Sequence, residues 1–457
     1  MGLPIDRGRA LEFLGGDEAV YQDLVSLLAD QAQQDLAALE AAVAAGDGRA
    51  VERVAHGLKG AAANLAADAV QEAAAELEQV GWSRDLAAAP AGLAALRDRV
   101  GELVAFARQS SAAAGDARPE EHEMTLRWGI IGCGNVAEHK GGPALYGVAG
   151  SELVAVMRRD VAKAADFARR HGARRWYDQA SDLLADAEIN AVYVATPVST
   201  HRGYTLAAAE AGKHVLCEKP MAMDVAECRE MIAACRANGV MLTIAYYRRS
   251  YPVVQRMKAA LAEGLIGRPM LARINLTSYS QPTDVRAPGA WRTDPDTAGG
   301  GVLFDVGSHR LDVLNYLLGP AAEVAAMCEN TLGHYQVEDA AVLCLKLASG
   351  VHGVANFGWN VGSDSDEFEI YGAEGKMLAR TLEGGHLEIY RGRELVETFD
   401  QPRHKVTHWG LVENMVAAAS TGAPLLCSGE DGLVTSQLME AAYLSARERR
   451  TIGVASG

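Results

Sequence analysis

Three groups of residues in this 457-residue chain have types and spacings suited to chemistry. His56 lies in the run AHGLKGAAANL. The run GIIGCGNVA, residues 129–137, has the glycine spacing of a phosphate-binding turn. Farther on, GGGVLFDVGSH carries Asp305 and His309 four residues apart. An imidazole can carry a phosphate or a proton, a glycine turn can hold a nucleotide, and a carboxylate beside a histidine supports proton transfer.

The first group falls on an amphipathic helix. With residues 51–69 placed at about 100° per residue, one stripe is apolar and predicted to be buried: Val51, Val54, Ala55, Leu58, Ala62 and Leu65. His56 lies on the solvent side, with Lys59 and Gly60 as its i+3 and i+4 neighbours. Lys59 is placed to pair with a phosphate on the ring. A glycine inside a helix costs roughly 1 kcal/mol relative to alanine, and a flat surface for an approaching protein would offset that cost. The alternative is an ordinary exposed histidine.

The second group predicts a dinucleotide site, because the glycine run follows a predicted strand and opens a helix. Gly132 allows the tight turn, and Gly134 lets backbone amides approach a pyrophosphate. Asn135 and Val136 complete the loop, and the small Ala137 lets helix and strand pack closely. The helix N-terminus favours the bound anion.

Two arginines follow the next predicted strand, at the place where a ribose-binding acid is usual. Arg158 and Arg159 suit the 2′-phosphate of NADP. A solvated charge cluster at a strand end is the other interpretation. We therefore expect NADP as the cofactor, with NAD as the alternative.

The third group predicts a helix face carrying Asp305, His309 and Asp312 at i, i+4 and i+7. A carboxylate beside a histidine can fix its tautomer and raise its basicity, so we expect Asp305 to orient His309. A surface charge pair is the alternative. Other side chains that follow predicted elements suit either substrate contact or packing and interface roles: Tyr247, Arg248, Trp291 and Arg292. His404 and His408 are expected to be ordinary loop histidines.

The elements that must position these groups divide the chain into parts. Residues 1–108 are rich in helix formers and predict an all-α four-helix bundle. Residues 109–124 have almost no large apolar side chain and predict a linker. Residues 125–245 alternate strands with helices, which predicts an α/β Rossmann domain. Residues 246–457 predict an α+β domain with a large, mostly antiparallel sheet, for substrate binding and oligomerisation.

Composition excludes several classes of protein. The formal net charge of −16 argues against binding nucleic acid or an anionic membrane. There is no run of about 18 apolar residues, and the acidic first twenty residues do not resemble a signal peptide. The seven cysteines show no zinc-like spacing, so we expect no metal centre and a reduced, cytoplasmic protein.

Residues 10–108 resemble a histidine-containing phosphotransfer (HPt) domain. The resemblance is carried by FLGGDEAVYQDLVSLLADQ, by AAGDGRAVERVAHGLKGAAANLAA and by AAAELE, in that order. It implies that His56 carries phosphate, that Lys59 and Gly60 support it, and that the partner is a response-regulator receiver domain. Ala66 departs from the glycine usual in the family.

Residues 125–450 resemble the Gfo/Idh/MocA oxidoreductases through GCGNVA, AVYVATPVSTH, AGKHVLCEKPMAM and GGGVLFDVGSH. The segments VMRRD, YYRR and WRTDP are similar to dihydrodiol-dehydrogenase-like members. The resemblance implies a catalytic lysine at Lys219, acting with Asp305 and His309. The nicotinamide-side contacts that it implies are Thr196, Pro197, His201 and Glu218. It also implies homo-oligomers formed through the open sheet.

Together these features predict an NAD(P)-dependent oxidoreductase for a sugar-, polyol- or dihydrodiol-like small molecule, fused to a phosphorelay module. Two rival hypotheses remain. One is a non-catalytic protein that senses nucleotide and alters phosphotransfer. The other makes the helical bundle an assembly module in which His56 is unused.

Overall fold

The computed structural model describes residues 4–13, 18–114, 124–279 and 291–455. The chain divides into two compact units, Met1–Glu121 and His122–Gly457, and each is described by itself. The fold class expected from the sequence is confirmed: a helical bundle, a parallel-sheet domain and a domain with a large mixed sheet. Within the described residues, no helix combines the length and apolarity needed to cross a membrane.

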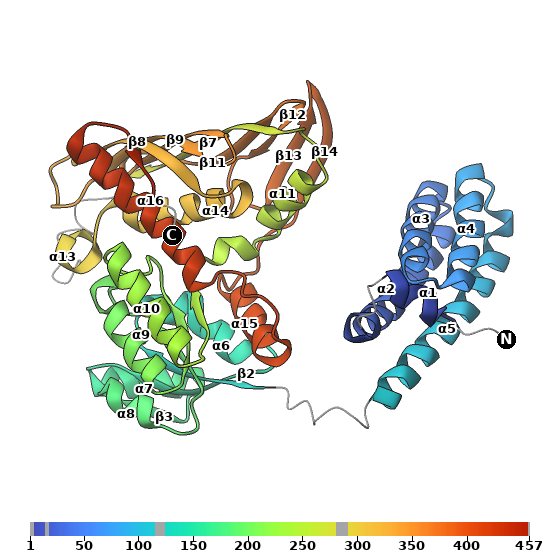
Figure 1. Ribbon diagram of the computed structural model, residues 1–457, viewed down its shortest axis with the longest axis horizontal. Helices are drawn as coiled ribbons and strands as arrows, with labels where there is room; N and C mark the ends of the chain where they lie inside the picture. Colours follow the sequence, from blue (N-terminus) through green and yellow to red (C-terminus); the bar gives the residue numbers. More distant parts are fainter. Residues whose placement is uncertain (1–3, 14–17, 115–123, 280–290, 456–457) are drawn as a thin grey trace. The chain divides into compact units, whose positions relative to one another are not determined.

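The first unit is built from helices around one apolar core (Figure 1). Its elements are α1 Arg7–Phe13, α2 Glu18–Ala44, α3 Gly48–Asn64, α4 Asp68–Ser83, the 3-10 turn η1 Leu86–Ala88 and α5 Ala89–Ala114. The Asp47 carboxylate caps α3 by accepting from the amides of Arg49 and Ala50, each at 3.0 Å. Helix α5 runs six residues past the predicted end of the bundle, through a stretch rich in Ala, which favours helix. Part of the predicted linker, residues 115–123, lies outside the described residues.

The turn between α3 and α4 explains why the HPt pattern usually has glycine where this chain has Ala66. Ala66 has a φ of 52°, in the left-handed region where glycine is favoured. Farther along α4, a Cβ on Gly81 would lie 2.4 Å from the backbone nitrogen of Glu52. Glycine at this position therefore lets α4 approach α3 closely, which places the two helices side by side behind His56.

The second unit begins with a six-stranded parallel sheet in the order β3-β2-β1-β4-β5-β6. Its strands are β1 Leu126–Ile131, β2 Ser151–Met157, β3 Arg175–Tyr177, β4 Ala191–Val194, β5 His214–Cys217 and β6 Leu242–Ile244. Its helices are the π-helix η2 Ala137–Gly141, α6 Gly142–Gly147, α7 Val161–His171, α8 Ala180–Ala185, η3 Val198–Thr200, α9 His201–Glu210 and α10 Val225–Ala237. The strand order reverses between β1 and β4, so the ligand site is expected at the carboxyl ends of these two strands.

A nine-stranded sheet follows, in the order β14-β13-β12-β11-β7-β10-β9-β8-β15, with one parallel pair, β7 with β10. Its strands are β7 Pro269–Tyr279, β8 Ala321–Glu329, β9 Ala340–Leu347, β10 His352–Gly358, β11 Asn360–Gly372, β12 Gly375–Ala379, β13 His386–Arg391, β14 Glu394–Asp400 and β15 Ile452–Gly453. Along β9, residues of the apolar core alternate with exposed ones, because one face of the sheet packs on helices and the other is open.

Helices and short turns lie on one side of this sheet (Figure 1). They are η4 Tyr247–Ser250, α11 Pro252–Ala262, η5 Trp291–Thr293, α13 Pro295–Ala298, the π-helix η6 Leu303–Gly307, α14 Ser308–Leu318, α15 Trp409–Thr421 and α16 Gly429–Glu448. Although α15 and α16 come last in the chain, α15 contacts α6 and α16 contacts α10. The two sheets of the second unit therefore share one continuous core.

Candidate functional sites

His56 projects from α3 with its side chain 70% exposed, as the helical pattern predicted. The stripe behind it is buried, apart from the half-buried Val54. Across the helix pair, the Glu78 carboxylate lies 2.6 Å from Nδ1 of His56 and also accepts a hydrogen bond from Lys59. These hydrogen bonds, that of Lys59 foremost, lower the pKa of Glu78. A carboxylate can only accept, so Nδ1 donates and the lone pair of Nε2 is left for an incoming group.

Sequence reasoning missed Glu78, which lies 22 residues from His56 and meets it only because α3 and α4 pair. Lys59, expected to face a phosphate, is bonded to Glu78 instead in this state. Cβ atoms built on Gly57 and Gly60 would meet nothing within 4 Å. Packing inside the bundle therefore does not require these two glycines, and the surface beside His56 is left low and open.

The glycine loop has the geometry of a dinucleotide turn. Gly132 has a φ of 95°, and a Cβ there would lie 2.7 Å from the carbonyl oxygen of Ala195, so glycine alone fits where β1 and β4 end side by side. A Cβ on Gly134 would meet nothing within 4 Å, which leaves its backbone open to a ligand. Ala137 is fully buried under the loop, as expected from its size.

A cavity of about 340 Å³ opens at this loop. Most of the predicted cofactor residues line it: Gly132, Gly134, Asn135, Val136, Arg158, Arg159, Thr196 and Pro197. Arg292, predicted to reach the substrate, lines it too. Nη1 of Arg158 donates to the carbonyl oxygen of Cys133 at 3.1 Å, which fixes this arginine beside the loop. The residues present therefore fit a nucleotide with an anionic group near the end of β2.

Lys219 follows β5 and reaches Asp305 on η6. Its Nζ lies 2.7 Å from Oδ1 and 2.8 Å from the backbone oxygen of Asp305, and the lysine side chain is 13% exposed. Burial raises the pKa of Asp305, but the charge and hydrogen bond of Lys219 outweigh burial and lower it. The ammonium group of Lys219 thus joins the end of the parallel strand β5 to η6 of the next domain.

The expectation that Asp305 orients His309 is wrong. The Asp305 carboxylate is bonded to Lys219, and Nδ1 of His309 has no hydrogen-bond partner in the described part of the chain. The reason is the π-helix that contains Asp305, because i→i+5 hydrogen bonding widens the turn and the i, i+4 alignment of an α-helix is lost. Asp312, the third member of the predicted face, is buried and bonded to Arg249.

His309 itself is almost fully buried between aromatic rings. Its ring centre lies 4.9 Å from that of Tyr247 and 5.7 Å from that of Tyr246. Burial, followed by the charges of Arg248 and Lys219, holds the pKa of His309 well below its usual range. The ring is therefore neutral at neutral pH and offers one hydrogen-bond donor and one acceptor.

Glu218, expected beside the nicotinamide, lies in a buried hydrogen-bond network. Its Oε1 accepts from the Tyr193 hydroxyl at 2.5 Å and from Nε2 of His408 at 2.8 Å. Burial would raise the pKa of Glu218, but the charge and hydrogen bonds of these partners lower it to about 2. The interpretation of His408 as an ordinary loop histidine is wrong, because this residue is fully buried and joins α15 to the end of β5. His404 is exposed, as expected.

His201 is also buried. Its ring nitrogens lie 2.9 Å from the carbonyl oxygen of Thr196 and 3.0 Å from that of Pro220. It does not line the cofactor cavity. His201 therefore ties the loop after β4 to the segment after β5, and it bears on the cofactor through the position of Thr196.

The residues predicted to reach the substrate have mixed surroundings. Arg248 donates to Glu383 and, at 3.2 Å, to the hydroxyl of Tyr247, so its guanidinium is held in place by the protein. Tyr247 contacts the ring of His309 and, at 4.9 Å between ring centres, that of His408. Trp291 begins η5, but its side chain lies outside the described residues.

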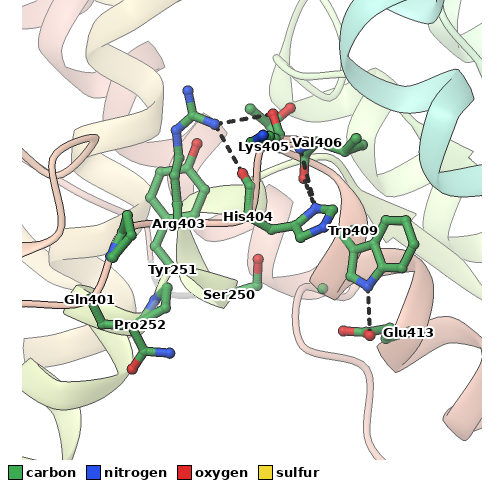
Figure 2. A pocket seen from close by; sticks show the side chains of 13 residues that line it. Ser250, Tyr251, Pro252, Gln401, Arg403, His404, Lys405, Val406, Trp409 and Glu413 are labelled. Carbon is green, nitrogen blue, oxygen red and sulfur yellow. Dashed lines mark hydrogen bonds between the residues drawn. The ribbon is translucent and has the colours of Figure 1, made fainter. Parts of the chain in front are cut away.

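A second cavity, of about 480 Å³, is formed by residues 250–252 and the segment 401–413 (Figure 2). Arg403 donates to the carbonyl oxygens of His404 and Lys405 there, and Nε1 of Trp409 donates to Glu413 at 2.7 Å. This cavity shares no lining residue with the cofactor cavity. The same segment carries His408, so its contribution to the reaction centre is the buried bond to Glu218.

The fold and these sites define two classes of protein in one chain: a dinucleotide-dependent α/β oxidoreductase with a lysine at its centre, and a helical bundle that presents a histidine. Comparison with known proteins supports both assignments. Residues 126–246 match the oxidoreductase family with an NAD-binding Rossmann fold, residues 254–378 match the GFO/IDH/MocA C-terminal domain, and residues 23–106 match the Hpt domain. The chain belongs to the Gfo/Idh/MocA family of oxidoreductases and carries an Hpt domain ahead of the enzyme.

Individual relatives support this assignment. "Oxidoreductase P35" of Formosa agariphila is 33% identical over 332 residues, which cover 70% of this chain and 98% of the relative. The 1,5-anhydro-D-fructose reductase of Ensifer adhaerens is 35% identical over 56% of this chain and 76% of its own. Among solved structures, the WlbA dehydrogenase of Bordetella pertussis, in complex with NADH and UDP-GlcNAcA, has a TM-score of 0.64 and 25% identity over 73% of this chain and 99% of that one. The chain is thus an NAD(P)-dependent oxidoreductase that acts on CH–OH groups.

Proposed function

We propose that the enzyme transfers hydride between a nicotinamide cofactor and a carbonyl or alcohol carbon of a sugar-, polyol- or dihydrodiol-like substrate, and that His56 accepts phosphate from a receiver domain. The observation that carries the enzymatic part is the ammonium group of Lys219, held by Asp305 at the carboxyl end of β5 and in the same region as the buried His309. Relatives named for a sugar reductase and for a complex with a nucleotide sugar support this substrate class.

The bound nicotinamide supplies or accepts the hydride. Reduction of a carbonyl builds negative charge on oxygen, and a donor is needed there in the transition state. Lys219 gives that proton in reduction and takes the hydroxyl proton in oxidation. Because Asp305 fixes Nζ through two oxygens, the lysine is oriented before substrate binds. The neutral His309 positions the same hydroxyl by hydrogen bonding.

The cofactor preferred in this proposal is NADP(H). Arg158 and Arg159 line the cavity next to the end of β2, and Arg158 is fixed by its bond to the glycine loop. Guanidinium–phosphate pairs are charge-assisted and often bidentate. The test is the dissociation constant of each cofactor for wild type and for Arg159→Ala. A wild-type preference for NAD(H), or an equal loss for both cofactors, would refute this part.

The phosphorelay part rests on the His56–Glu78–Lys59 cluster and the open glycine surface beside it. The receiver supplies the aspartyl phosphate, and Nε2 of His56 attacks the phosphorus while the Asp–phosphate bond breaks. The experiment is transfer of labelled phosphate from a panel of phosphorylated receiver domains to the full chain, with His56→Gln as the control. Equal labelling of the variant would remove His56 from the reaction. No labelling from any receiver would favour the assembly role of the bundle.

A homo-oligomer through the open face of the large sheet also belongs to this proposal. Met327, Val342 and Val354 lie on neighbouring strands of that face and are 71%, 44% and 43% exposed. Apolar side chains gathered on one open face are typical of an interface. Light scattering of wild type and Met327→Asp tests it, and a monomeric wild type would refute it.

A further inference from the structure

The backbone at Lys219 is held by a buried hydrogen-bond network. Oε2 of Glu218 accepts from the backbone amide of Lys219 at 3.2 Å. The other oxygen, Oε1, accepts from the Tyr193 hydroxyl and from Nε2 of His408. Glu218 is 7% exposed and His408 is fully buried, so these two side chains have little access to water and depend on each other. Both donors to Oε1 therefore bear on the place of the carboxylate that holds the Lys219 amide.

Lys219 is thus held at both ends. At the tip, Nζ donates to the Asp305 carboxylate at 2.7 Å, and at the base the backbone amide donates to Glu218. A lysine side chain is long and has many rotamers, and a reacting group must be held in place before reaction for the rate to benefit. The two anchors together define one position for Nζ, so a shift of Glu218 would displace the ammonium group from its place at Asp305.

His408 also contacts the His309 side of the reaction centre. The Tyr247 ring lies between the two histidines, with its centre 4.9 Å from that of His408 and 4.9 Å from that of His309. Nδ1 of His408 lies 3.0 Å from Oγ1 of Thr407, so both of its ring nitrogens have partners. Because the Glu218 carboxylate can only accept, Nε2 of His408 is the donor. The ring is therefore fixed in orientation between two groups that border the site.

We propose that His408 is a positioning residue: it holds Glu218, and through Glu218 it holds Lys219 where this lysine exchanges a proton with the substrate. This inference rests on the proposed oxidoreductase function and gives the N-cap of α15 a part in the reaction. It also changes the role expected for Glu218. Both of its oxygens are engaged by the protein, so in this proposal Glu218 serves the lysine rather than the nicotinamide.

The test compares the full-length wild type with His408→Ala, which removes the donor to Glu218, and with His408→Gln, whose amide nitrogen can replace it. Tyr193→Phe removes only a hydroxyl and is the second variant if His408→Ala does not fold. Leu387→Ala is the control, because Leu387 is a fully buried residue of β13 whose truncation destabilises the same unit without removing a bond of the network. Kinetics are measured with D-glucose, D-xylose and myo-inositol, and dissociation constants with NADPH and NADH.

His408→Ala should lower kcat at least about tenfold, because small displacements of a reacting group cost rates on this scale. KM and cofactor affinity should stay within about twofold, since no residue of the network lines the cofactor cavity. His408→Gln should recover most of kcat, and Tyr193→Phe should lower it about threefold, as expected for one neutral donor.

Three results would overturn the proposal. One is an unchanged kcat in folded His408→Ala or, where that variant does not fold, in Tyr193→Phe. Another is an equal loss of kcat in Leu387→Ala, which would make the role of His408 merely structural. The third is a loss that lies in KM or in cofactor affinity and leaves kcat intact.

Hydrogen exchange followed by mass spectrometry separates failure of this inference from failure of the proposed function, because it needs no substrate. The peptide 217–223 contains the Lys219 amide, and its exchange reports the bond to Glu218. Faster exchange of this peptide in His408→Ala but not in Leu387→Ala, with no sugar turned over by wild type, would support the positioning role and refute catalysis on these substrates. Unchanged exchange in His408→Ala, with normal turnover, would keep the enzymatic function and refute the role of His408.

Discussion

The ammonium group of Lys219 has fixed partners in this site, whereas His309 does not. Asp305 accepts from Lys219 through a carboxylate and a carbonyl oxygen, and Nδ1 of His309 is left without a partner among the described residues. We therefore propose Lys219 as the proton donor, and Nδ1 of His309 as a group left for a hydrogen bond to the substrate.

Replacement of Lys219 by alanine should lower kcat by at least roughly 100-fold, which is the low end of general acid–base contributions. Affinity for the cofactor should stay within several-fold, because Lys219 does not line the cofactor cavity. Steady-state kinetics and cofactor titration measure the two effects, and Asp305→Asn is the companion variant that keeps the lysine. An unchanged kcat would remove Lys219 from the mechanism, and a loss explained by cofactor affinity would make it a binding residue.

On the bundle, Glu78→Gln should slow phosphotransfer to His56. The carboxylate holds the proton on Nδ1 and so favours attack by Nε2. Comparable partners that orient metal-binding histidines are worth about 10–100-fold, and we expect about tenfold here. Phosphorus NMR of the product should show phosphate on Nε2 in wild type. An unchanged rate, with phosphate on Nδ1, would contradict the assigned tautomer.

At the scale of elements, local patterns were predictable and long-range contacts were not. The turn at Gly132 and the exposed position of His56 follow from spacing within one strand–helix junction or one helix. The partner of His408 is 190 residues away in the sequence, so no local pattern marks this histidine. The prediction that Asp305 orients His309 was wrong because it assumed α-helical turns. The sequence carries no signal for the π-helix that the structure forms there.

His408 joins three elements, since Glu218 accepts from it and from Tyr193 of β4. His408→Ala should lower the free energy of unfolding by about 3 kcal/mol, because it leaves a buried carboxylate without one partner. His404→Ala is the matched control on the same segment, and its cost should stay under about 1 kcal/mol because the exposed His404 contributes a ring contact with Trp409 and a local hydrogen bond from the Val406 amide. Chemical denaturation of the full chain measures both. Equal, small losses would show that the Glu218 network does not stabilise the enzyme.

At the scale of the whole molecule, two units with different chemistry share one chain. The division at Glu121 separates the surface around His56 from the reaction centre around Lys219. The contacts described above for each site join residues of the same unit. We therefore expect catalysis to survive replacement of His56.

The most direct test is NADPH- and NADH-dependent turnover by the full chain over a panel of neutral and acidic sugars, inositols and dihydrodiols, followed by nicotinamide absorbance. Wild type, His56→Gln and Lys219→Ala are compared, each shown to be folded and to bind cofactor. We expect wild type and His56→Gln to turn over at least one sugar- or polyol-like compound, and Lys219→Ala to lose that turnover. A folded, cofactor-binding wild type that turns over none of the panel, or a Lys219→Ala protein as active as wild type, would contradict it.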